Sequence, residues 1–387
     1  MTKENIADGI HALLPRDQMC MGARKYRDFY DMVPGAGFYQ KEFGFYSLEE
    51  WGIGTGIDSN PELDALFGYD PEGRVDLEGL GWCEAGFCPL FEEKVLEDLG
   101  DYELVQDFAG RSVLYFKGRR NGFMPQYKEH PVKDFRSWEE ICLPRLDPSS
   151  PERLEKIRNY MPEIVEKAKQ GLFIGQKIVG GYMYLRSLIG PENLLYMFYD
   201  DPELIHACMQ QWLVLADAVT AEHQKYVSFD EVFIGEDICY NHGPLISPDM
   251  MREFLFPYYQ QLITNIRSRQ IDKERLLGFQ VDTDGYSIPV IELYRSLGMT
   301  HMSPFEVASG CDVLSVAEKY PDLRISGGVD KRVLAQGKEA IDEMVDRIFP
   351  VMKARGGYLP TCDHGVPPEV SLEDYQYFRK RCLEFAD

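Results

Sequence analysis

The feature that most constrains the fold is a regular alternation of short apolar runs and longer amphipathic runs from about residue 150 to the C-terminal end. Short runs rich in Val, Ile and Phe are typical of buried strands, and apolar residues spaced three or four apart are typical of helices. Strands are therefore predicted at 172–181, 231–238, 276–285, 300–308, 323–330 and 357–365. Helices are predicted at 150–171, 201–226, 247–269, 287–298, 311–320, 338–356 and 371–386. Six strands, each followed by a helix, indicate a parallel sheet covered by helices.

Capping residues support three of these helices. Ser150 and Asp201 each precede a proline at the first helical position, where a missing N–H group costs nothing. Ser371 and Asp374 have the spacing of a capping box. The predicted helix starts are therefore marked by chemistry as well as by periodicity.

The first 120 residues are less regular. Aromatic residues and glycines crowd the first 70 positions without clear periodicity, which suggests helices and loops packed around a larger body. Residues 75–82 could form a strand, and residues 102–120 predict a hairpin around an Asp-Phe-Ala-Gly turn. One or two strands from this region would bring the number of units to eight. We therefore predict an α/β fold, a (β/α)8 TIM barrel at 121–387 with an N-terminal helical and hairpin elaboration at 1–120.

An open, doubly wound sheet is the less favoured alternative. No Gly-x-Gly-x-x-Gly sequence follows an early strand, which argues against a dinucleotide-binding fold. A single barrel also suits the length, because α/β barrels often exceed about 250 residues as one unit.

Charge and cysteine content restrict the function. The chain of 387 residues carries a net charge of −23, which opposes binding to nucleic acid or to an anionic membrane. Its nine cysteines form no Cys-x-x-Cys pair, so a disulfide framework is not expected. The N-terminal residues lack the apolar core of a signal peptide, and no apolar run is long enough for a membrane helix. A cytoplasmic location is the expectation.

Ionisable residues collect where the predicted strands end. In a barrel the carboxyl ends of the strands surround the active site, so these side chains should share one rim. Some of them could instead be helix N-caps, because Asp is common there. Two acids two residues apart point to the same side of a strand and need a cation, a shared proton or water. The residues concerned are Glu236, Asp237, Asp282, Asp284, Glu306, Asp330, Lys331, Cys362, Asp363 and His364.

Three segments resemble the uroporphyrinogen decarboxylase superfamily. They are GEDICYNHGPLISPDMMREFLFPYYQQLI, GGVDKRVLAQG and GGYLPTCDHGVPPEVSLEDYQYF, and they occur in the order of the family motifs. The resemblance covers about residues 150–385 and implies a (β/α)8 barrel. The superfamily contains true decarboxylases and zinc- and corrinoid-dependent methyltransferases.

The chain resembles the methyltransferase branch more closely. The arginine-rich stretch and the Phe-Ser-Asp of the decarboxylases are absent, and residues 22–29 are a poor substitute. The methyltransferase zinc motif, His-x-Cys-Gly, falls on the run Asp282-Thr283-Asp284-Gly285, and a late Cys ligand falls on His364. The resemblance thus implies Asp282, Asp284 and His364 as ligands of zinc or another divalent metal, with Cys362 as a secondary candidate.

The resemblance implies a corrinoid-dependent methyltransferase that demethylates a small methylated compound, for example a methoxylated one. No Asp-x-His-x-x-Gly motif is present, so a partner protein is expected to carry the corrinoid. The alternatives are a decarboxylase-like lyase acting on a smaller acid and a non-catalytic binding barrel. The oligomeric state is open, with a homodimer considered.

Roles can be assigned to the rim residues on this basis. The predicted catalytic residues are Asp282, Asp284, His364, Glu236 and Asp237. The predicted substrate-binding residues are Tyr240, His242, Glu306, Asp330 and Arg186. Alternatives stay open for several of them: a buried Asp330–Lys331 ion pair, a loop held by hydrogen bonds around Tyr240 and His242, and a helix-surface position for Arg186.

Overall fold

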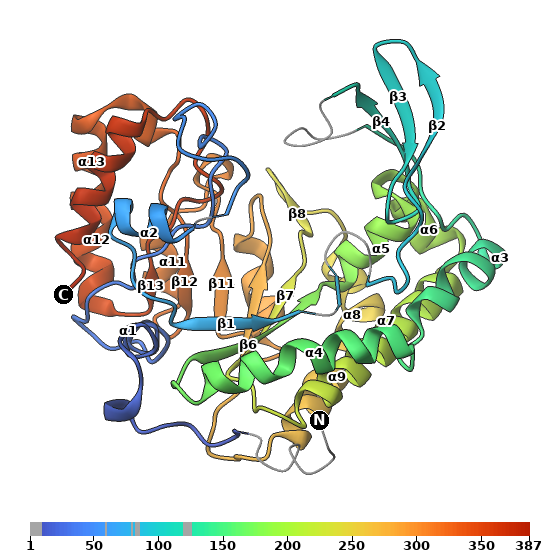
Figure 1. The fold of residues 1–387 in the computed structure, drawn as a ribbon, viewed down its shortest axis with the longest axis horizontal. Helices are drawn as coiled ribbons and strands as arrows, with labels where there is room; N and C mark the ends of the chain where they lie inside the picture. The colour runs from blue at the N-terminus through green and yellow to red at the C-terminus, as the bar shows by residue number, and fades with distance from the viewer. Residues whose placement is uncertain (1–9, 59, 79, 82–85, 119–125) are drawn as a thin grey trace.

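Seven parallel strands form a curled sheet at the centre of the molecule (Figure 1). The structure is a computed structural model that describes residues 10–58, 60–78, 80–81, 86–118 and 126–387. The strands follow the order β1, β6, β7, β10, β11, β12, β13, and every neighbouring pair is parallel. Their bounds are Arg74–Leu77, Phe173–Val179, Glu231–Gly235, Gly278–Asp282, His301–Ser303, Arg324–Ser326 and Tyr358–Leu359. The predicted α/β barrel fold is confirmed, and the hydrogen-bonded ladder of the described residues contains seven strands.

Helices cover the outer face of this sheet. Between consecutive strands of this seven-stranded sheet, from β6 to β13, the chain forms at least one helix, as the alternating pattern predicts. The helices are α4 Pro151–Ala168, α5 Gly181–Ile189, α6 Pro191–Asp200, α7 Pro202–His223, α8 Pro248–Phe254, α9 Phe256–Arg269, α10 Ile291–Arg295, α11 Val313–Lys319, α12 Lys338–Arg355 and α13 Leu372–Leu383.

Two predicted helices differ in detail. The run predicted at 247–269 is two helices, α8 and α9, that meet at Leu255, two residues before Pro257. Proline has no N–H group to continue the helical ladder, so the helix breaks there. The run predicted at 287–298 is a short 3-10 turn, Ile288–Val290, followed by the five-residue α10.

Caps form at two of the three predicted helix starts. The Asp201 side chain accepts a hydrogen bond from the Leu204 N–H group, and Ser371 accepts one from Asp374. Ser150 makes no side-chain cap bond, although Pro151 does begin α4.

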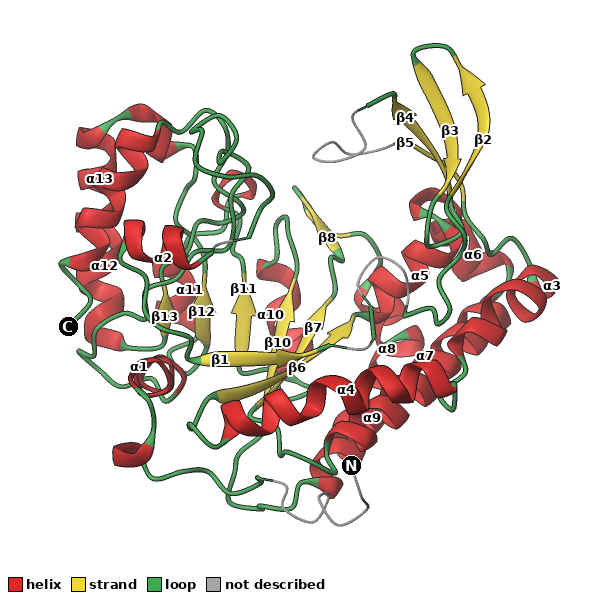
Figure 2. Ribbon diagram, viewed as in Figure 1, coloured by secondary structure: helices red, strands yellow, loops and turns green. Residues whose placement is uncertain are grey.

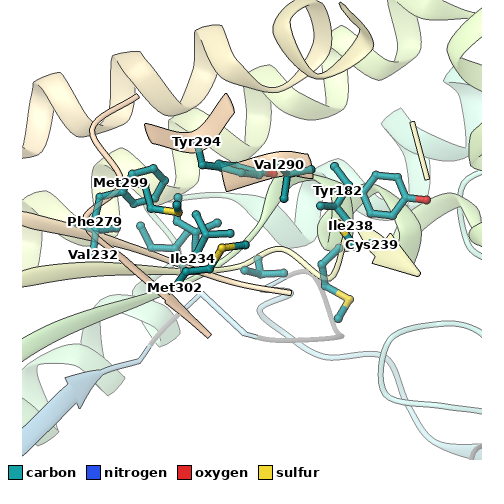
Figure 3. Close-up of a cluster of buried hydrophobic side chains, with 14 of the residues drawn as sticks. Tyr182, Val232, Ile234, Ile238, Cys239, Phe279, Val290, Tyr294, Met299 and Met302 are labelled. Carbon is teal, nitrogen blue, oxygen red and sulfur yellow. The ribbon is translucent and has the colours of Figure 1, made fainter. Parts of the chain in front are cut away.

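Side chains on the strands alternate between two environments. Val232, Ile234, Phe279 and Met302 face the helices and pack in a continuous apolar cluster with Tyr294 (Figure 3). The intervening residues, such as Gln280 and Asp282, face the inside of the curled sheet. In the ladder Asp282 pairs with Gly235 on one side and Ser303 on the other, so these residues lie at one level.

The N-terminal part contributes α1 (Met21–Tyr30), α2 (Pro61–Phe67) and a separate antiparallel sheet (Figure 2). That sheet contains β2 (Lys94–Leu99), β3 (Tyr102–Gln106), β4 (Ser112–Phe116) and β5 (Gln126–Glu129). The predicted hairpin is confirmed as β3 and β4, and residues 119 and 120 of the prediction lie outside the described residues. The predicted strand at 75–82 corresponds in part to β1, which begins at Arg74 and ends at Leu77; residues 79 and 82 of the prediction lie outside the described residues. A short α-helix and two short strands complete the α-helices and strands of the described residues: α3 (Phe135–Ser137), β8 (Cys239–Tyr240) and β9 (Gly243–Pro244).

An irregular segment joins the two edges of the seven-stranded sheet. The Glu42 carboxylate accepts a hydrogen bond from the Cys362 N–H group, just beyond β13, at 2.8 Å. The Tyr39 hydroxyl accepts one from the Gly73 N–H group, just before β1, at 3.0 Å. Residues 39–42 therefore lie between β13 and β1. They are joined to both edges by hydrogen bonds that their side chains accept, and not by strand pairing through the backbone. None of the helices in the described part of the chain has both the length and the apolar character needed to span a membrane.

Candidate functional site

Asp282 lies at the carboxyl end of β10, on the inner face of the sheet. The Ser303 hydroxyl donates to its Oδ2 atom at 2.5 Å, and Gln280 Nε2 donates to Ser303 Oγ at 2.9 Å. Burial raises the pKa of Asp282 to about 6, and the nearby Asp237 carboxylate adds to this effect. Asp282 therefore exchanges its proton close to neutral pH.

Asp284 and His364 meet above Asp282. Their closest atoms, Asp284 Oδ2 and His364 Nε2, are 3.7 Å apart. Burial, followed by repulsion from the Asp282 and Asp237 carboxylates, raises the pKa of Asp284 to about 7. Asp284 and His364, two of the residues predicted to share the rim, are thus close together.

The His364 ring is held between two aromatic side chains. Its centroid lies 5.2 Å from that of Phe43 and 5.6 Å from that of Tyr46, which stacks on it. Burial, together with the Lys331 charge, lowers the pKa of His364. A neutral imidazole with a raised-pKa carboxyl beside it can accept or relay a proton near neutral pH.

Lys331 is a site residue to which the sequence analysis gave no role of its own. Its Nζ atom lies 3.5 Å from Asp363 and 3.7 Å from Glu306. The Glu306 carboxylate also accepts the Gly285 N–H group, which fixes the loop that carries Asp284. The considered Asp330–Lys331 ion pair is not formed: Asp330 pairs with Arg332, two residues further along the chain, at 2.8 Å, and Lys331 lies by Asp363 and Glu306.

Glu236 and Asp237 are adjacent in sequence but differ in environment. Glu236 is fully buried and accepts a hydrogen bond from the Tyr259 hydroxyl at 2.6 Å and one from the Tyr182 N–H group at 3.3 Å. Burial raises the pKa of Glu236 to about 7. Asp237 has a positive φ of 45° and forms an ion pair with Arg186 at 2.5 Å. Glu236 thus ties β7 to the start of α5, whereas Asp237 and Arg186 face each other at the rim.

Tyr240 and His242 belong to the β8–β9 turn, with their ring centroids 5.6 Å apart. The Tyr240 carbonyl accepts the Tyr286 N–H group, which joins this turn to the loop after Asp284. Tyr240 is half-exposed, so its ring is available to a ligand at the mouth.

The predicted metal ligands do not form a complete site. No group of three His, Cys, Asp or Glu side chains suited to a metal ion occurs within the described residues. The Asp282 carboxylate is hydrogen-bonded to Ser303, whereas Asp284 and His364 contact each other. Cys362 is fully buried beside Glu42, and burial raises its pKa well above its usual value. These residues therefore do not fit a three-ligand zinc centre in this arrangement.

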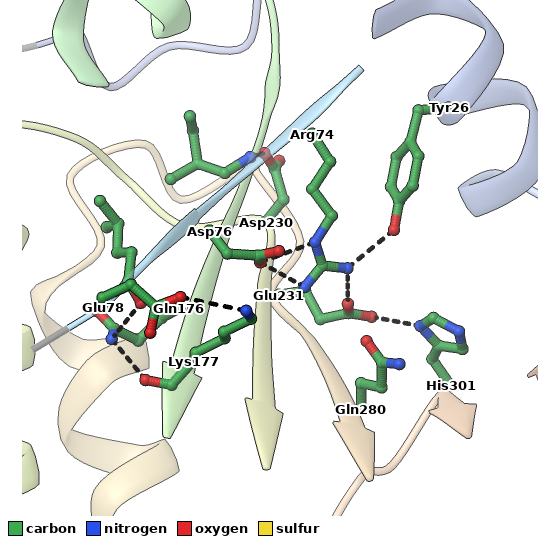
Figure 4. Close-up of polar contacts among 12 residues, drawn as sticks. Tyr26, Arg74, Asp76, Glu78, Gln176, Lys177, Asp230, Glu231, Gln280 and His301 are labelled. Atoms are coloured by element: carbon green, nitrogen blue, oxygen red, sulfur yellow. Dashed lines mark hydrogen bonds and ion pairs between the residues drawn. The ribbon is translucent and has the colours of Figure 1, made fainter. Parts of the chain in front are cut away.

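A cavity of about 810 Å³ lies inside the curled sheet, next to Asp282. At its floor Arg74 forms ion pairs with Asp76 at 2.7 Å and Glu231 at 2.6 Å, and Glu231 bonds His301 at 3.0 Å (Figure 4). The sequence analysis singled out none of these four residues. The alternation of charged and apolar residues in Arg74-Val75-Asp76-Leu77 could have indicated Arg74 and Asp76, whereas Glu231 and His301 join them only through the tertiary structure. A cavity of this size is typical of a small-molecule site.

Comparison with known proteins defines the family. The uroporphyrinogen decarboxylase (URO-D) family model matches residues 114–385. The chain belongs to the uroporphyrinogen decarboxylase family. Two curated uroporphyrinogen decarboxylases, from Geotalea uraniireducens and Geotalea daltonii, are each 22% identical over 258 residues, which cover 64% of this chain and 69% of each relative.

A solved structure shares the fold over nearly the whole length. A methyltransferase from Methanosarcina mazei superposes with a TM-score of 0.59 at 15% sequence identity, covering 95% of this chain and 99% of the other. At this identity the similarity concerns the fold. The resemblance to the uroporphyrinogen decarboxylase superfamily is thereby confirmed, with a methyltransferase of the same fold as a structural neighbour.

Proposed function

We propose that the protein is a methyltransferase that removes a methyl group from a small methoxylated compound bound in the cavity. The observation that carries this proposal is Asp282, a buried carboxyl with a pKa raised to about 6, at the boundary between the cavity and the rim. A carboxyl whose pKa lies near 6 is protonated in slightly acidic solution and can give up its proton close to neutral pH, which suits general acid catalysis. The methyltransferase fold neighbour supports the proposal.

The reaction needs a proton at the ether oxygen. The protonated Asp282 would donate to this oxygen as the methyl–oxygen bond breaks, so that the oxygen leaves as an alcohol. Ser303 fixes the Asp282 carboxyl through its 2.5 Å hydrogen bond, and Asp282 lines the cavity in which the ligand would bind. Water would then return a proton to Asp282, with Asp284 and His364 at the mouth as the relay.

The methyl acceptor is proposed to be a corrinoid on a separate protein. A reduced corrinoid supplies the nucleophile that takes the methyl group. The half-exposed rings of Phe43, Tyr46 and Tyr240 at the mouth offer flat apolar surfaces against which such a group could pack. No described residue is assigned to the cobalt.

Methylation of added reduced cobalamin, followed by its absorbance change, tests the proposal with a methoxylated ring compound as donor. We expect Asp282→Asn to lower kcat about 100-fold or more, because a general acid typically contributes this factor. The wild-type rate should fall as the pH rises through about 6, because the acid must be protonated. Asp249→Asn, on the exposed side of α8, is the control and should leave the rate unchanged. An Asp282→Asn rate equal to that of the wild type would refute the assigned role.

A carboxy-lyase acting on a smaller acid is the second candidate. The similarity to the two curated decarboxylases favours it. It predicts release of carbon dioxide from a carboxylic acid without any corrinoid, which the same preparation can be assayed for. Binding of ligands with neither reaction would instead support a non-catalytic barrel.

A further inference from the structure

Each basic side chain among the described residues that line the cavity already has an acidic partner. Lys41 lies 3.1 Å from Asp64, and Lys177 lies 3.1 Å from Glu78. Arg74, at the floor, is held between two carboxylates. An anionic group entering the cavity would have to displace one of these partners to gain an ion pair.

Acidic side chains also outnumber basic ones in this lining. The basic residues are Lys41, Arg74 and Lys177. The acidic residues are Asp58, Asp64, Glu72 and Asp76, together with Glu42 and Asp282, whose pKa values are raised by burial. A carboxylate that enters such a site loses its hydration and is repelled by acidic side chains. Both effects make the free energy of binding less favourable. The charge of the cavity is therefore expected to make an uncharged ligand bind more tightly than its carboxylated analogue.

The walls and the volume suit a ring. Tyr26, Tyr39, Phe43, Phe233 and Leu359 provide aromatic and apolar surface around the cavity. A cavity of about 810 Å³ has room for many water molecules. A one-carbon donor would displace only a few of them, whereas a substituted aromatic ring would release many and cover the aromatic walls.

We infer that the cavity selects an uncharged methoxylated ring compound and rejects the carboxylated analogue, with Glu78 and Asp64 as specificity-determining residues that neutralise Lys177 and Lys41. This inference rests on the proposed function for the methyl group but concerns binding, which is measurable without any acceptor. Glu78 acts through Lys177 and lies on the exposed side of that pair, so its replacement leaves the barrel core untouched (Figure 4).

Calorimetric titration of the full chain with dimethoxybenzyl alcohol and with dimethoxybenzoate tests the inference. The two probes have similar shape and differ in charge. We expect the alcohol to bind at least tenfold more tightly than the benzoate. Glu78→Gln should release Lys177 and reduce this ratio about tenfold, mainly by tightening the binding of the benzoate.

Glu373→Gln is the matched control, because Glu373 is also an exposed glutamate paired with a lysine, Lys338, but on the far helices. It should leave both affinities unchanged. Equal or tighter binding of the benzoate by the wild type, a ratio unaffected by Glu78→Gln, or no binding of either probe would overturn the inference. Methyl transfer from the benzoate would then leave the proposed function standing. Selective binding of the alcohol without any methyl transfer would refute the proposed methyltransferase activity and would still support the inferred preference for an uncharged ligand.

Discussion

At the scale of single residues, burial decides which carboxyl groups can take part in proton transfer. Asp282, Asp284 and Glu236 all have a raised pKa, and in each case burial is the main cause. Only the first two lie by the cavity or its mouth, whereas Glu236 is enclosed by Tyr259 and Tyr182. A raised pKa therefore indicates a candidate for proton transfer at Asp282 and Asp284. At Glu236 it reflects the burial of a carboxyl group in the core.

Glu236 should make stability depend on pH. Its pKa rises from 4.5 to about 7 on folding, so the folded state holds the proton more tightly and loses stability as the pH rises through this range. The loss amounts to about 3 kcal/mol above pH ~7. Glu236→Gln, which resembles the protonated form, should remove this loss in urea unfolding measured at about pH 5 and about pH 8.

Glu253→Gln, on the exposed face of α8, is the control for this experiment. It should leave the pH dependence of unfolding as in the wild type. A Glu236→Gln variant whose stability still falls by the wild-type amount between the two pH values would show that Glu236 is not the group responsible.

At the scale of elements, short loops after the strands fix the rim. The loop after β10 turns at Gly285, where φ is +79° and a Cβ atom would lie 2.7 Å from the Tyr240 backbone. The loop is also anchored by the bond from the Gly285 N–H group to Glu306. Close backbone contact between two loops thus sets the position of Asp284.

Gly285→Ala should destabilise the protein and disturb the site together. A side chain here adds a clash to the cost of a positive φ, so we expect a loss of about 2–4 kcal/mol in the free energy of unfolding. Gly35→Ala is the matched control: its φ is +76° but no atom lies within 4 Å of its Cβ position, so only about 1 kcal/mol should be lost. Urea unfolding measures both, and equal losses would contradict the close contact with Tyr240.

At the scale of the whole molecule, the curled sheet brings the strand ends together but does not bring three metal ligands to one point. Asp284 and His364 approach each other to 3.7 Å, and Asp282 is hydrogen-bonded to Ser303. The barrel is completed on one side by residues 39–42, which also line the cavity with Tyr39 and Lys41.

Metal content is therefore a direct test of this arrangement. We expect the purified protein to retain less than one equivalent of zinc, manganese or iron after dialysis, because the described residues supply only two adjacent ligands. Elemental analysis of the wild type and of Asp284→Ala measures this. One tightly held equivalent that disappears in the variant would mean that the loops close around an ion in solution and that the metal predicted from the family resemblance is correct.

The sequence by itself determined the order of strands and helices, and the enrichment of ionisable residues at the strand ends, because periodicity and capping are local properties. Glu236 and Asp282 were both predicted from the same pattern, yet one is enclosed in the core and the other faces a cavity. Only the tertiary structure decided this, because burial depends on contacts between distant segments. The Arg74–Glu231–His301 floor and the Glu42–Cys362 link join residues that are far apart in the chain. No local pattern encodes such pairs, and they define the cavity and its charge.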